Sequence, residues 1–274
     1  MIESDGAAEP QDAAAYFGRE AQFAREALGL SQVALASELH YQQPYVSKVE
    51  RGIQFASEEY AAGLDRLCRT PGVYARLRER LSKRGHPGWF IPYLNLEKDA
   101  TRVEDYSNAF VMGMLQTAEY AEATFRAVHP RETDDQIKVR VEARLRRYEV
   151  MRREAPPLLW VILHEAVLRT VVGSPAVMVA QLDHLISEAA SPHITLQVLR
   201  YKAGAPASSL PFTLLTPDDG ATVLYSETRD QGHVIDSAAA VGSAQATYER
   251  LRAAARSPEK SVSLFREIAE EHTR

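Results

Sequence analysis

A short stretch in the first quarter of the chain places amide and cationic side chains at helical spacing, and these groups could contact a nucleic acid. The outward residues are Gln43, Pro44, Ser47, Lys48 and Arg51. A glutamine can pair with adenine through two hydrogen bonds, and a lysine can donate to guanine. Val46 and Val49 are three residues apart on the other side of the same predicted helix. The pattern therefore predicts a helix whose exposed face fits the major groove of DNA.

A second helix and a tight turn are needed to hold that face in place. Upstream of it, apolar residues recur near helical spacing, which predicts the first helix of a pair; they are Leu30, Val33, Leu35, Ala36 and Leu39. Ser31 stands just before this run, at the position of an N-cap. Gly52 ends the second segment, as glycine commonly does at the carboxyl end of a helix. Packing the two apolar sides together leaves the polar face of the second helix open.

The segment from Gly29 to Gly52 resembles the helix-turn-helix of the Cro and phage-repressor (XRE) family. The matching residues are the opening Gly-Leu-Ser-Gln, the Leu-Ala that follows, and the closing Val-Ser-Lys-Val-Glu-Arg-Gly, in register without a gap. The resemblance implies that Gln32 binds a DNA phosphate and that Gln43, Tyr45 and Lys48 point into the major groove, with Ser47 and Arg51 on the same face. It also implies a buried ion pair between Arg25 and Glu50 that ties the preceding helix to the recognition helix.

Three features of this segment and its following loop depart from the pattern of that family. Pro44 stands where a polar base-reading residue is common, although proline suits the first turn of a helix. His40 occupies the turn, where glycine or another small residue is usual. The loop from Gly52 to Glu59 contains no Lys or Arg. Fewer phosphate contacts predict weaker and less salt-sensitive DNA binding.

Composition bounds the class of protein. The chain has 274 residues, which suggests two domains, and 45% hydrophobic and 25% charged residues, which are ordinary for a soluble globular protein. Cys68 is the only cysteine, so an internal disulfide or a cysteine metal cluster is excluded. No apolar run approaches membrane-spanning length and the amino-terminus lacks a signal-peptide core, so we expect a cytoplasmic protein without a membrane partner.

Charge is distributed unevenly along the chain. The formal net charge is −5, yet residues 16–85 contain eleven Lys and Arg against eight Asp and Glu. The positive excess therefore coincides with the predicted helix-turn-helix, as the electrostatic footprint of a nucleic-acid-binding domain should.

The apolar pattern divides the chain into four parts. Residues 1–14 form a predicted disordered tail. Helices at 16–28, from Ser57 onward and at 71–83 complete, with the helix-turn-helix, an all-α five-helix DNA-binding domain over residues 15–84. Residues 85–100 form an apolar connecting segment, whose aromatic content predicts that it packs on another part of the protein. Residues 101–274 form an α+β domain with a small mixed or antiparallel sheet.

The elements of this last domain follow from local patterns. Strands are expected at 101–106, 158–163, 194–199, 212–215 and 223–226, and helices at 116–128, 134–154, 175–190, 237–255 and 258–272. The run Leu158–Leu163 is continuously apolar, which is typical of a buried strand.

The second half also resembles the C-terminal domain of a group of antitoxin-like helix-turn-helix regulators from actinobacteria. The residues that carry the resemblance are Gly113–Thr117, Glu119–Ala121, Arg140–Arg144, Leu163–Arg169, Gly173, Gln181, Leu182, Pro211–Thr213, Tyr225–Glu227 and Ser257–Glu259. Members commonly lie beside a gene for a small protein, so the resemblance implies a small protein partner encoded nearby. Met112 replaces a usual proline and Tyr148 a common glutamine, which predicts a different specificity if these positions shape a partner or ligand site.

The second half offers little catalytic chemistry. His164-Glu165 is not a zinc motif, because no second histidine follows at helical spacing, and no nucleophile elbow or phosphate-binding glycine loop is present. We therefore expect no catalytic residue, no metal and no cofactor. Glu165, Arg169 and Glu227 stand at predicted strand ends and could line a ligand or partner pocket. The alternative is an internal ion pair that fixes strand-to-helix corners.

These observations predict a sequence-specific DNA-binding transcriptional regulator that binds double-stranded DNA as a homodimer. A single helix-turn-helix reads few base pairs, and two-fold pairing doubles the site. The α+β domain would supply dimerisation and partner or ligand sensing. One alternative is an antitoxin-type protein-interaction module in which DNA binding is secondary. Another is an enzyme regulated by attachment to DNA.

Overall fold

The computed structural model describes residues 13–82, 86, 88–228 and 231–273. The chain divides into two compact units, Met1–Gly85 with Thr133–Ala143 and His86–Glu132 with Arg144–Arg274. The predicted tail at 1–14 lies outside the described residues except for its last two positions. Among the helices that are described, none combines the length and the apolar character that crossing a membrane requires.

The N-terminal region is helical. Its elements are α1 (Ala13–Ala27), α2 (Gln32–Glu38), α3 (Gln43–Glu50), α4 (Glu58–Cys68) and α5 (Val73–Ser82). Ser31 and Ser57 cap α2 and α4 as predicted, since each hydroxyl accepts a hydrogen bond from the backbone N–H three residues later. The helices enclose one apolar core that includes Phe17, Leu35, Val46, Val49, Tyr60 and Leu64.

Successive helices in this region end in the same way. Gly29, His40, Gly52 and Arg69 adopt positive φ angles of 53° to 69° just after α1, α2, α3 and α4. After α2, His40 N–H donates to the carbonyl of Ser37 and Tyr41 N–H to that of Ala36, which is the Schellman pattern. Glycine is usual at the position of His40 in the helix-turn-helix family that this segment resembles, because a left-handed residue with a side chain is strained.

Helices α1 and α3 approach each other closely at Gly18. A Cβ atom at this position would overlap the carbonyl oxygens of Val49 and Glu50 at the end of α3. Because backbone carbonyls cannot yield as a flexible side chain can, only glycine permits this approach. Gly18 therefore sets the distance between α1 and the recognition helix.

The second unit contains a six-stranded mixed sheet in the order β3-β2-β1-β4-β5-β6. The strands are β1 (Ala100–Ser107), β2 (Leu158–His164), β3 (Ile194–Leu199), β4 (Phe212–Pro217), β5 (Val223–Glu227) and β6 (Gly232–Ile235). Strands β1, β2 and β3 are parallel, whereas β4, β5 and β6 join by antiparallel pairing. The sheet is larger than predicted because the short strand β6 carries no clear alternation in the sequence.

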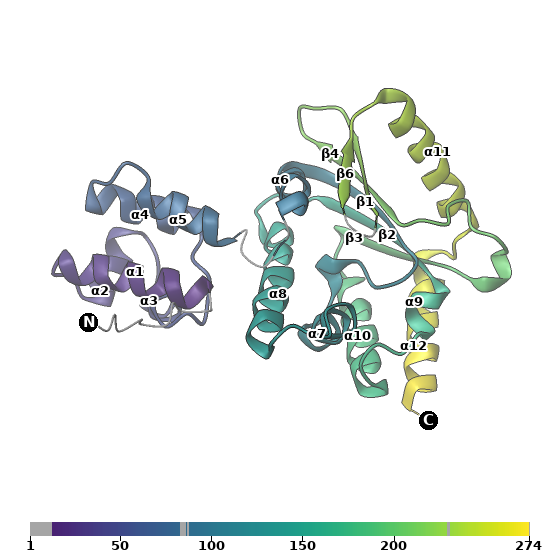
Figure 1. Ribbon diagram of the computed structural model, residues 1–274, viewed down its shortest axis with the longest axis horizontal. Coiled ribbons are helices and arrows are strands. Elements are labelled where there is room, and N and C mark those ends of the chain that lie inside the picture. The colour runs from purple at the N-terminus through teal and green to yellow at the C-terminus, as the bar shows by residue number, and fades with distance from the viewer. Residues whose placement is uncertain (1–12, 83–85, 87, 229–230, 274) are drawn as a thin grey trace, which may run out of the picture. The chain divides into compact units, whose positions relative to one another are not determined.

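Helices cover both faces of the sheet (Figure 1). They are α6 (Ile91–Asp99), α7 (Ala118–Val128), α9 (Glu165–Arg169), α10 (Pro175–Glu188), α11 (Ala238–Ala254) and α12 (Pro258–Thr273). Most of α8 (Asp134–Arg146) belongs to the first unit, and its last three residues belong to the second. Apolar residues of α10 and α12 share one core with one face of the sheet, and those of α11 share a second core with the other face. Alternation along the strands divides the two sets, since Val161 faces the first core and Ile162 the second.

Two stretches differ from the prediction. The helix expected over 134–154 ends at Arg146 and continues as the 3₁₀ helix η3 (Arg147–Arg152), where Arg147 turns to a partner on α6. The connecting segment forms the 3₁₀ helix η1 (Gly88–Phe90) and then α6, and its residues Phe90 and Tyr93 are buried in the first core of the second unit. The buried aromatic side chains of this segment are therefore part of that core.

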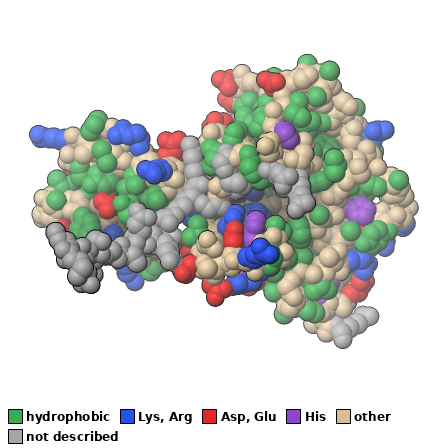
Figure 2. All heavy atoms as spheres, viewed as in Figure 1, with side chains coloured by type: hydrophobic (Ala, Val, Ile, Leu, Met, Phe, Trp, Pro, Cys, Tyr) green, Lys and Arg blue, Asp and Glu red, His purple; other side chains and the backbone are tan. Residues whose placement is uncertain are grey.

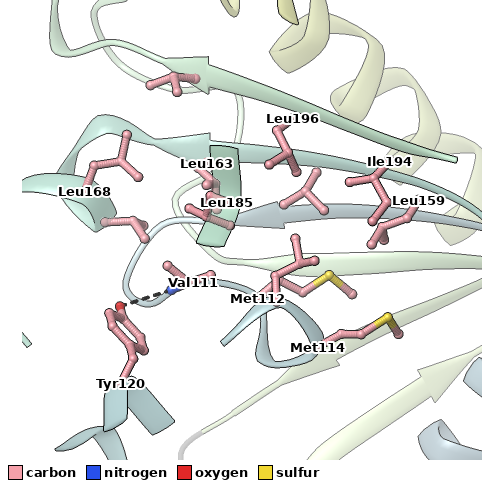
Figure 3. Packing of buried hydrophobic residues seen from close by; sticks show 14 of the residues in the cluster. Val111, Met112, Met114, Tyr120, Leu159, Leu163, Leu168, Leu185, Ile194 and Leu196 are labelled. Atoms are coloured by element: carbon pink, nitrogen blue, oxygen red, sulfur yellow. Dashed lines mark hydrogen bonds between the residues drawn. The ribbon is translucent and has the colours of Figure 1, made fainter. Parts of the chain in front are cut away.

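The loop after β1 is anchored beneath the sheet. Val111, Met112 and Met114 point into the apolar core beside Leu159 and strand β3, and the hydroxyl of Tyr120 accepts a hydrogen bond of 3.2 Å from Val111 N–H (Figure 3). This loop includes the 3₁₀ helix η2 (Gly113–Leu115). The buried amide of Gln181 on α10 accepts from Thr117 N–H and donates to the carbonyl of Leu115, each at 2.8 Å.

The outer edge of β3 is closed by Arg256 and the first turn of α12. Ser261 Oγ accepts a hydrogen bond of 3.0 Å from Val198 N–H, and Arg256 N–H donates to the carbonyl of Val198 at 2.9 Å. The side chain of Gln197 donates to the carbonyl of Arg256 at 2.6 Å. Hydrogen-bonding groups that an edge strand would leave open are thus occupied. At the opposite edge, β6 pairs with β5.

Replacing Gly18 with alanine should destabilise the first unit by about 1–3 kcal/mol, because the methyl group overlaps the end of α3. Gly242 is the matched control, since it lies in α11 and a Cβ there meets nothing within 4 Å. Gly242→Ala should instead stabilise the chain by roughly 0.5–1 kcal/mol. Thermal unfolding of the full chain by circular dichroism compares the two variants. Equal shifts of the same sign would contradict the close approach of α1 and α3.

Candidate nucleic-acid interface

The recognition helix is fastened to α1 by a two-point ion pair. Arg25 Nε lies 2.6 Å from Glu50 Oε1, and Arg25 Nη2 lies 3.0 Å from Glu50 Oε2. The remaining guanidinium nitrogen donates to the carbonyl of Leu30 at 2.9 Å. The side chain of Glu50 is only 3% exposed. Two residues expected as an ion pair therefore lie in contact, and this pair joins α1, the start of α2 and the end of α3.

Two amide side chains extend this network to the exposed surface. Gln32 Nε2 donates to Glu50 Oε2 at 2.8 Å, and Gln43 Nε2 donates to Gln32 Oε1 at 2.8 Å. The chain from Glu50 through Gln32 to Gln43 orients both amides, because each hydrogen bond fixes which end of the amide is the donor. Gln43 retains its second N–H and its carbonyl oxygen for another partner. Gln32 lies at the amino-terminal end of α2 but faces Glu50 and Gln43.

The other predicted contact residues lie along the exposed side of α3. Lys48 and Arg51 are exposed, whereas Ser47 is partly exposed. Arg51 Nε donates to the carbonyl of Ser47 at 3.2 Å, which holds its guanidinium against the end of the helix. Pro44 occupies the first turn of α3, as predicted, and Gln42 at the N-cap makes no side-chain capping bond. Ser47, Lys48 and Arg51 therefore form a polar surface along the exposed side of α3.

Tyr45 is held between α3 and the start of α4. Its hydroxyl accepts a hydrogen bond of 2.9 Å from Ser57 N–H, and its ring stacks on Tyr41 with centroids 4.4 Å apart. The ring of Tyr60 lies 5.6 Å away on the inner side. Tyr45 therefore ties α3 to the start of α4, and its contact with the major groove, which the family resemblance implied, stays a prediction.

Apolar side chains replace cations around the recognition helix. Ile53 in the loop after α3 is 62% exposed and Val33 on α2 is 66% exposed. On the face of the molecule in Figure 2, Lys and Arg side chains of the described residues occur in small groups and form no extended basic surface. Ile53 thus exposes an apolar side chain in the loop that contains no Lys or Arg.

The three candidate pocket residues of the second half do not form one site. Glu165 is buried, and its carboxylate accepts from Arg169 Nε at 2.8 Å, Arg200 Nε at 3.2 Å and Tyr201 N–H at 3.0 Å. Burial raises the pKa of Glu165, but these hydrogen bonds outweigh it and the pKa is lowered. The arrangement matches the alternative of an ion pair at the corner between β2 and α9.

Glu227 lies elsewhere on the sheet. It ends β5, and three strand spacings, roughly 14 Å, separate β5 from β2. Its Oε1 accepts a hydrogen bond of 2.8 Å from the hydroxyl of Tyr225. Glu227 therefore lies apart from Glu165 and Arg169, and local sequence could not reveal this because it does not give the order of the strands.

A buried ion pair that the sequence did not reveal lies near Tyr225. Arg147 donates to both oxygens of Glu97, at 2.9 Å and 2.6 Å, and Tyr93 donates to the same carboxylate at 2.7 Å. The side chains of Arg147 and Glu97 are 8% and 2% exposed. Burial lowers the pKa of Arg147, but the Glu97 carboxylate outweighs burial and the pKa is raised. The rings of Tyr93 and Tyr225 lie 4.3 Å apart between centroids.

Asp105 is a second buried acid in this region. Ser107 Oγ donates to its carboxylate at 2.6 Å and Thr213 Oγ1 at 2.8 Å. Burial raises the pKa of Asp105 to about 6, although these hydrogen bonds and the charge of Arg147 act in the opposite direction. Within the described residues, no group of three or more His, Cys, Asp or Glu side chains could hold a metal ion.

Comparison with known families agrees with the two units. Residues 17–81 match a Helix-turn-helix domain, which indicates a DNA-binding regulator. Residues 90–267 match the family described as Domain of unknown function (DUF5753). Since that match covers more than half of the chain, the protein belongs to the DUF5753 family. No curated protein and no solved structure matches the chain.

Removing Arg25 should unfold the first unit more easily, because Arg25→Ala leaves the buried Glu50 carboxylate without its cation. The expected loss is about 3–5 kcal/mol of unfolding free energy. The double variant Arg25→Met with Glu50→Leu should recover most of it, since both charges are then removed together. Urea denaturation of the three proteins measures this. A double variant no more stable than Arg25→Ala would contradict the assigned pairing.

The pKa of Asp105 predicts a dependence of stability on pH. Since the folded pKa of about 6 exceeds the value of about 3.9 for an unfolded aspartate, the folded state binds the proton more tightly. Stability should therefore fall as pH rises from about 4 to about 6 and remain lower above that range. Asp105→Asn should stabilise the protein by about 1–3 kcal/mol at pH 7.5 and by progressively less toward pH 4. Denaturation midpoints across this range test it, and a pH-independent difference would count against the buried titration.

Proposed function

We propose that this protein is a sequence-specific, XRE-type DNA-binding transcriptional regulator. The observation that carries the proposal is the chain of hydrogen bonds from Arg25 and Glu50 through Gln32 to Gln43. It fixes a glutamine amide on the exposed side of a helix before DNA arrives. A side chain that is already oriented loses less conformational freedom on binding. Together with exposed Lys48, this face supplies a base-reading amide and a cation.

The orientation of Gln43 favours adenine as its partner base. Its free carbonyl oxygen can accept from adenine N6, and its second N–H can donate to adenine N7. Both groups remain available after the bond to Gln32. Lys48 would donate to guanine or to a phosphate from the same face.

The second unit completes the regulator in this proposal. We assign the chain an antitoxin-like role as a cytoplasmic homodimer, because one recognition helix reads too few base pairs for genomic specificity. The α+β unit would provide dimerisation and respond to a small protein encoded nearby or to a small ligand. The proposal gives the chain no enzymatic activity.

A protein-interaction module with secondary DNA binding is the second candidate. The exposed apolar residues Phe23, Val33 and Ile53 on the first unit favour it, since they would pack well in a protein interface. Purification with a small partner protein and without retention on DNA would support this candidate. Retention on DNA by the purified chain alone would support the regulator.

Alanine at Gln43 or Lys48 should weaken binding to the specific site by roughly 1–3 kcal/mol each and affect random DNA less. Gln22→Ala is the control, because Gln22 is also a surface glutamine and its amide binds Glu26 within α1 at 2.8 Å. Fluorescence anisotropy with the protein's own upstream DNA and a shuffled duplex, at several salt concentrations, measures all three. Equal losses on both duplexes at Gln43 would mean that it reads no base.

The wild-type salt dependence tests the interface as a whole. Few exposed cations predict a shallow slope of affinity against salt, together with a clear preference for the upstream duplex. A steep slope without sequence preference would contradict the regulator and leave only general electrostatic binding.

A further inference from the structure

Two arginines of the second unit converge on one glycine. Arg144 at the end of α8 and Arg147 at the start of η3 both lie against Gly113 of η2, where a Cβ atom would overlap their side chains. A side chain at position 113 would force Arg147 to move and would press tightly on Arg144. The two guanidinium groups carry like charges and repel each other. Holding both beside one glycine therefore needs compensation from nearby anions or from a ligand.

Only one of these arginines has a carboxylate partner among the described residues. Arg147 is neutralised by Glu97, whereas Arg144 donates to the neutral amide of Gln116 at 2.7 Å and stacks over the ring of Phe125 at 4.7 Å. Burial, and then the charge of Arg147, lowers the pKa of Arg144 to about 10. The charge of Arg144 is therefore held in an unfavourable environment.

The guanidinium of Arg144 has few partners among the described residues. Arg144 is partly exposed as a residue, and its hydrogen bond to Gln116 uses one of its five N–H donors. The exposed carboxylate of Glu227 acts on Arg144 electrostatically without forming an ion pair with it. A group with a planar pair of oxygens could bind the guanidinium through two parallel hydrogen bonds.

We propose that Arg144 is the anion-binding residue of a small-ligand site in the second unit, formed with Gly113, Gln116 and Phe125. The ligand carries a carboxylate or a phosphate group, which supplies the negative charge that Arg144 lacks. The proposal names the chemical class of ligand that the sensing domain of the proposed regulator would bind. Only the biological use of the site rests on that proposed function. The site replaces the pocket expected from Glu165 and Arg169.

A purely structural role for Arg144 makes a different prediction. Gln116 Nε2 donates to the carbonyl of Val111 at 2.7 Å, so Arg144 could serve to hold Gln116 and the loop of Val111 in place. In that case Arg144→Gln would destabilise the protein whether or not an anion is present. If Arg144 instead serves to bind a ligand, Arg144→Gln removes a charge that no carboxylate neutralises. The midpoint of thermal unfolding in chloride buffer should then stay unchanged or rise by roughly 2–4 °C.

Thermal unfolding of the full chain tests the site with sodium phosphate and sodium succinate as probes, against sodium chloride at equal ionic strength and pH 7.5. The wild-type midpoint should rise saturably with at least one probe, as ligand binding to the folded state requires. Arg144→Gln should remove the saturable part and keep only the general salt effect. Arg126→Gln is the control, because Arg126 is an exposed arginine of α7 that pairs with Glu122.

The variants also separate this site from phosphate binding by the helix-turn-helix, which Arg144→Gln leaves intact. Glu227→Gln should strengthen the response, because it removes a negative charge near the incoming anion. The probe with the larger Arg144-dependent rise identifies the anionic group. No saturable rise with either probe, an equal rise in Arg144→Gln, or a loss of stability in Arg144→Gln in chloride would each overturn the proposal.

Discussion

Withdrawing a carboxylate from water is costly unless hydrogen bonds or a cation compensate for it, and each unit of this protein pairs one such carboxylate with an arginine. Glu50 meets Arg25 in the first unit, and Glu97 meets Arg147 in the second, each through two contacts of 2.6–3.0 Å. The partners come from different elements in both cases. Apolar packing brings elements together without fixing their angle closely, whereas a two-point ion pair fixes both distance and angle.

In the first unit, this constraint has a direct consequence for the exposed surface. The carboxylate that binds Arg25 also accepts from Gln32, which in turn accepts from Gln43. The orientation of a surface amide therefore originates in a buried charge two side chains away. Gly18 contributes from the backbone, because it lets α1 approach α3 closely enough for Arg25 to reach Glu50.

Much of the fold is predictable because it depends on local rules. The apolar periods, the serine cap at Ser31 and the terminating Gly52 identified the helix-turn-helix, and Ser57 marked the start of the next helix. One continuous apolar run and other local patterns identified five strands. The features that sequence did not reveal depend on residues far apart in the chain. Glu97 and Arg147 are fifty residues apart, and Asp105 and Thr213 meet only because β4 pairs with β1. The packing of Tyr45 on Tyr41 and Tyr60 likewise depends on residues of other turns and helices.

The closed edge of β3 gives the last helix a role beyond filling the core. Ser261 and Arg256 occupy the hydrogen-bonding groups of Val198, while Leu264, Phe265 and Ile268 on α12 cover the apolar face beside it. Proteolytic loss of this helix would uncover an apolar strand and its free backbone groups at once, which is the combination that recruits other chains into intermolecular sheets. We therefore expect the carboxyl-terminal helix to protect the protein against aggregation as well as to complete its core.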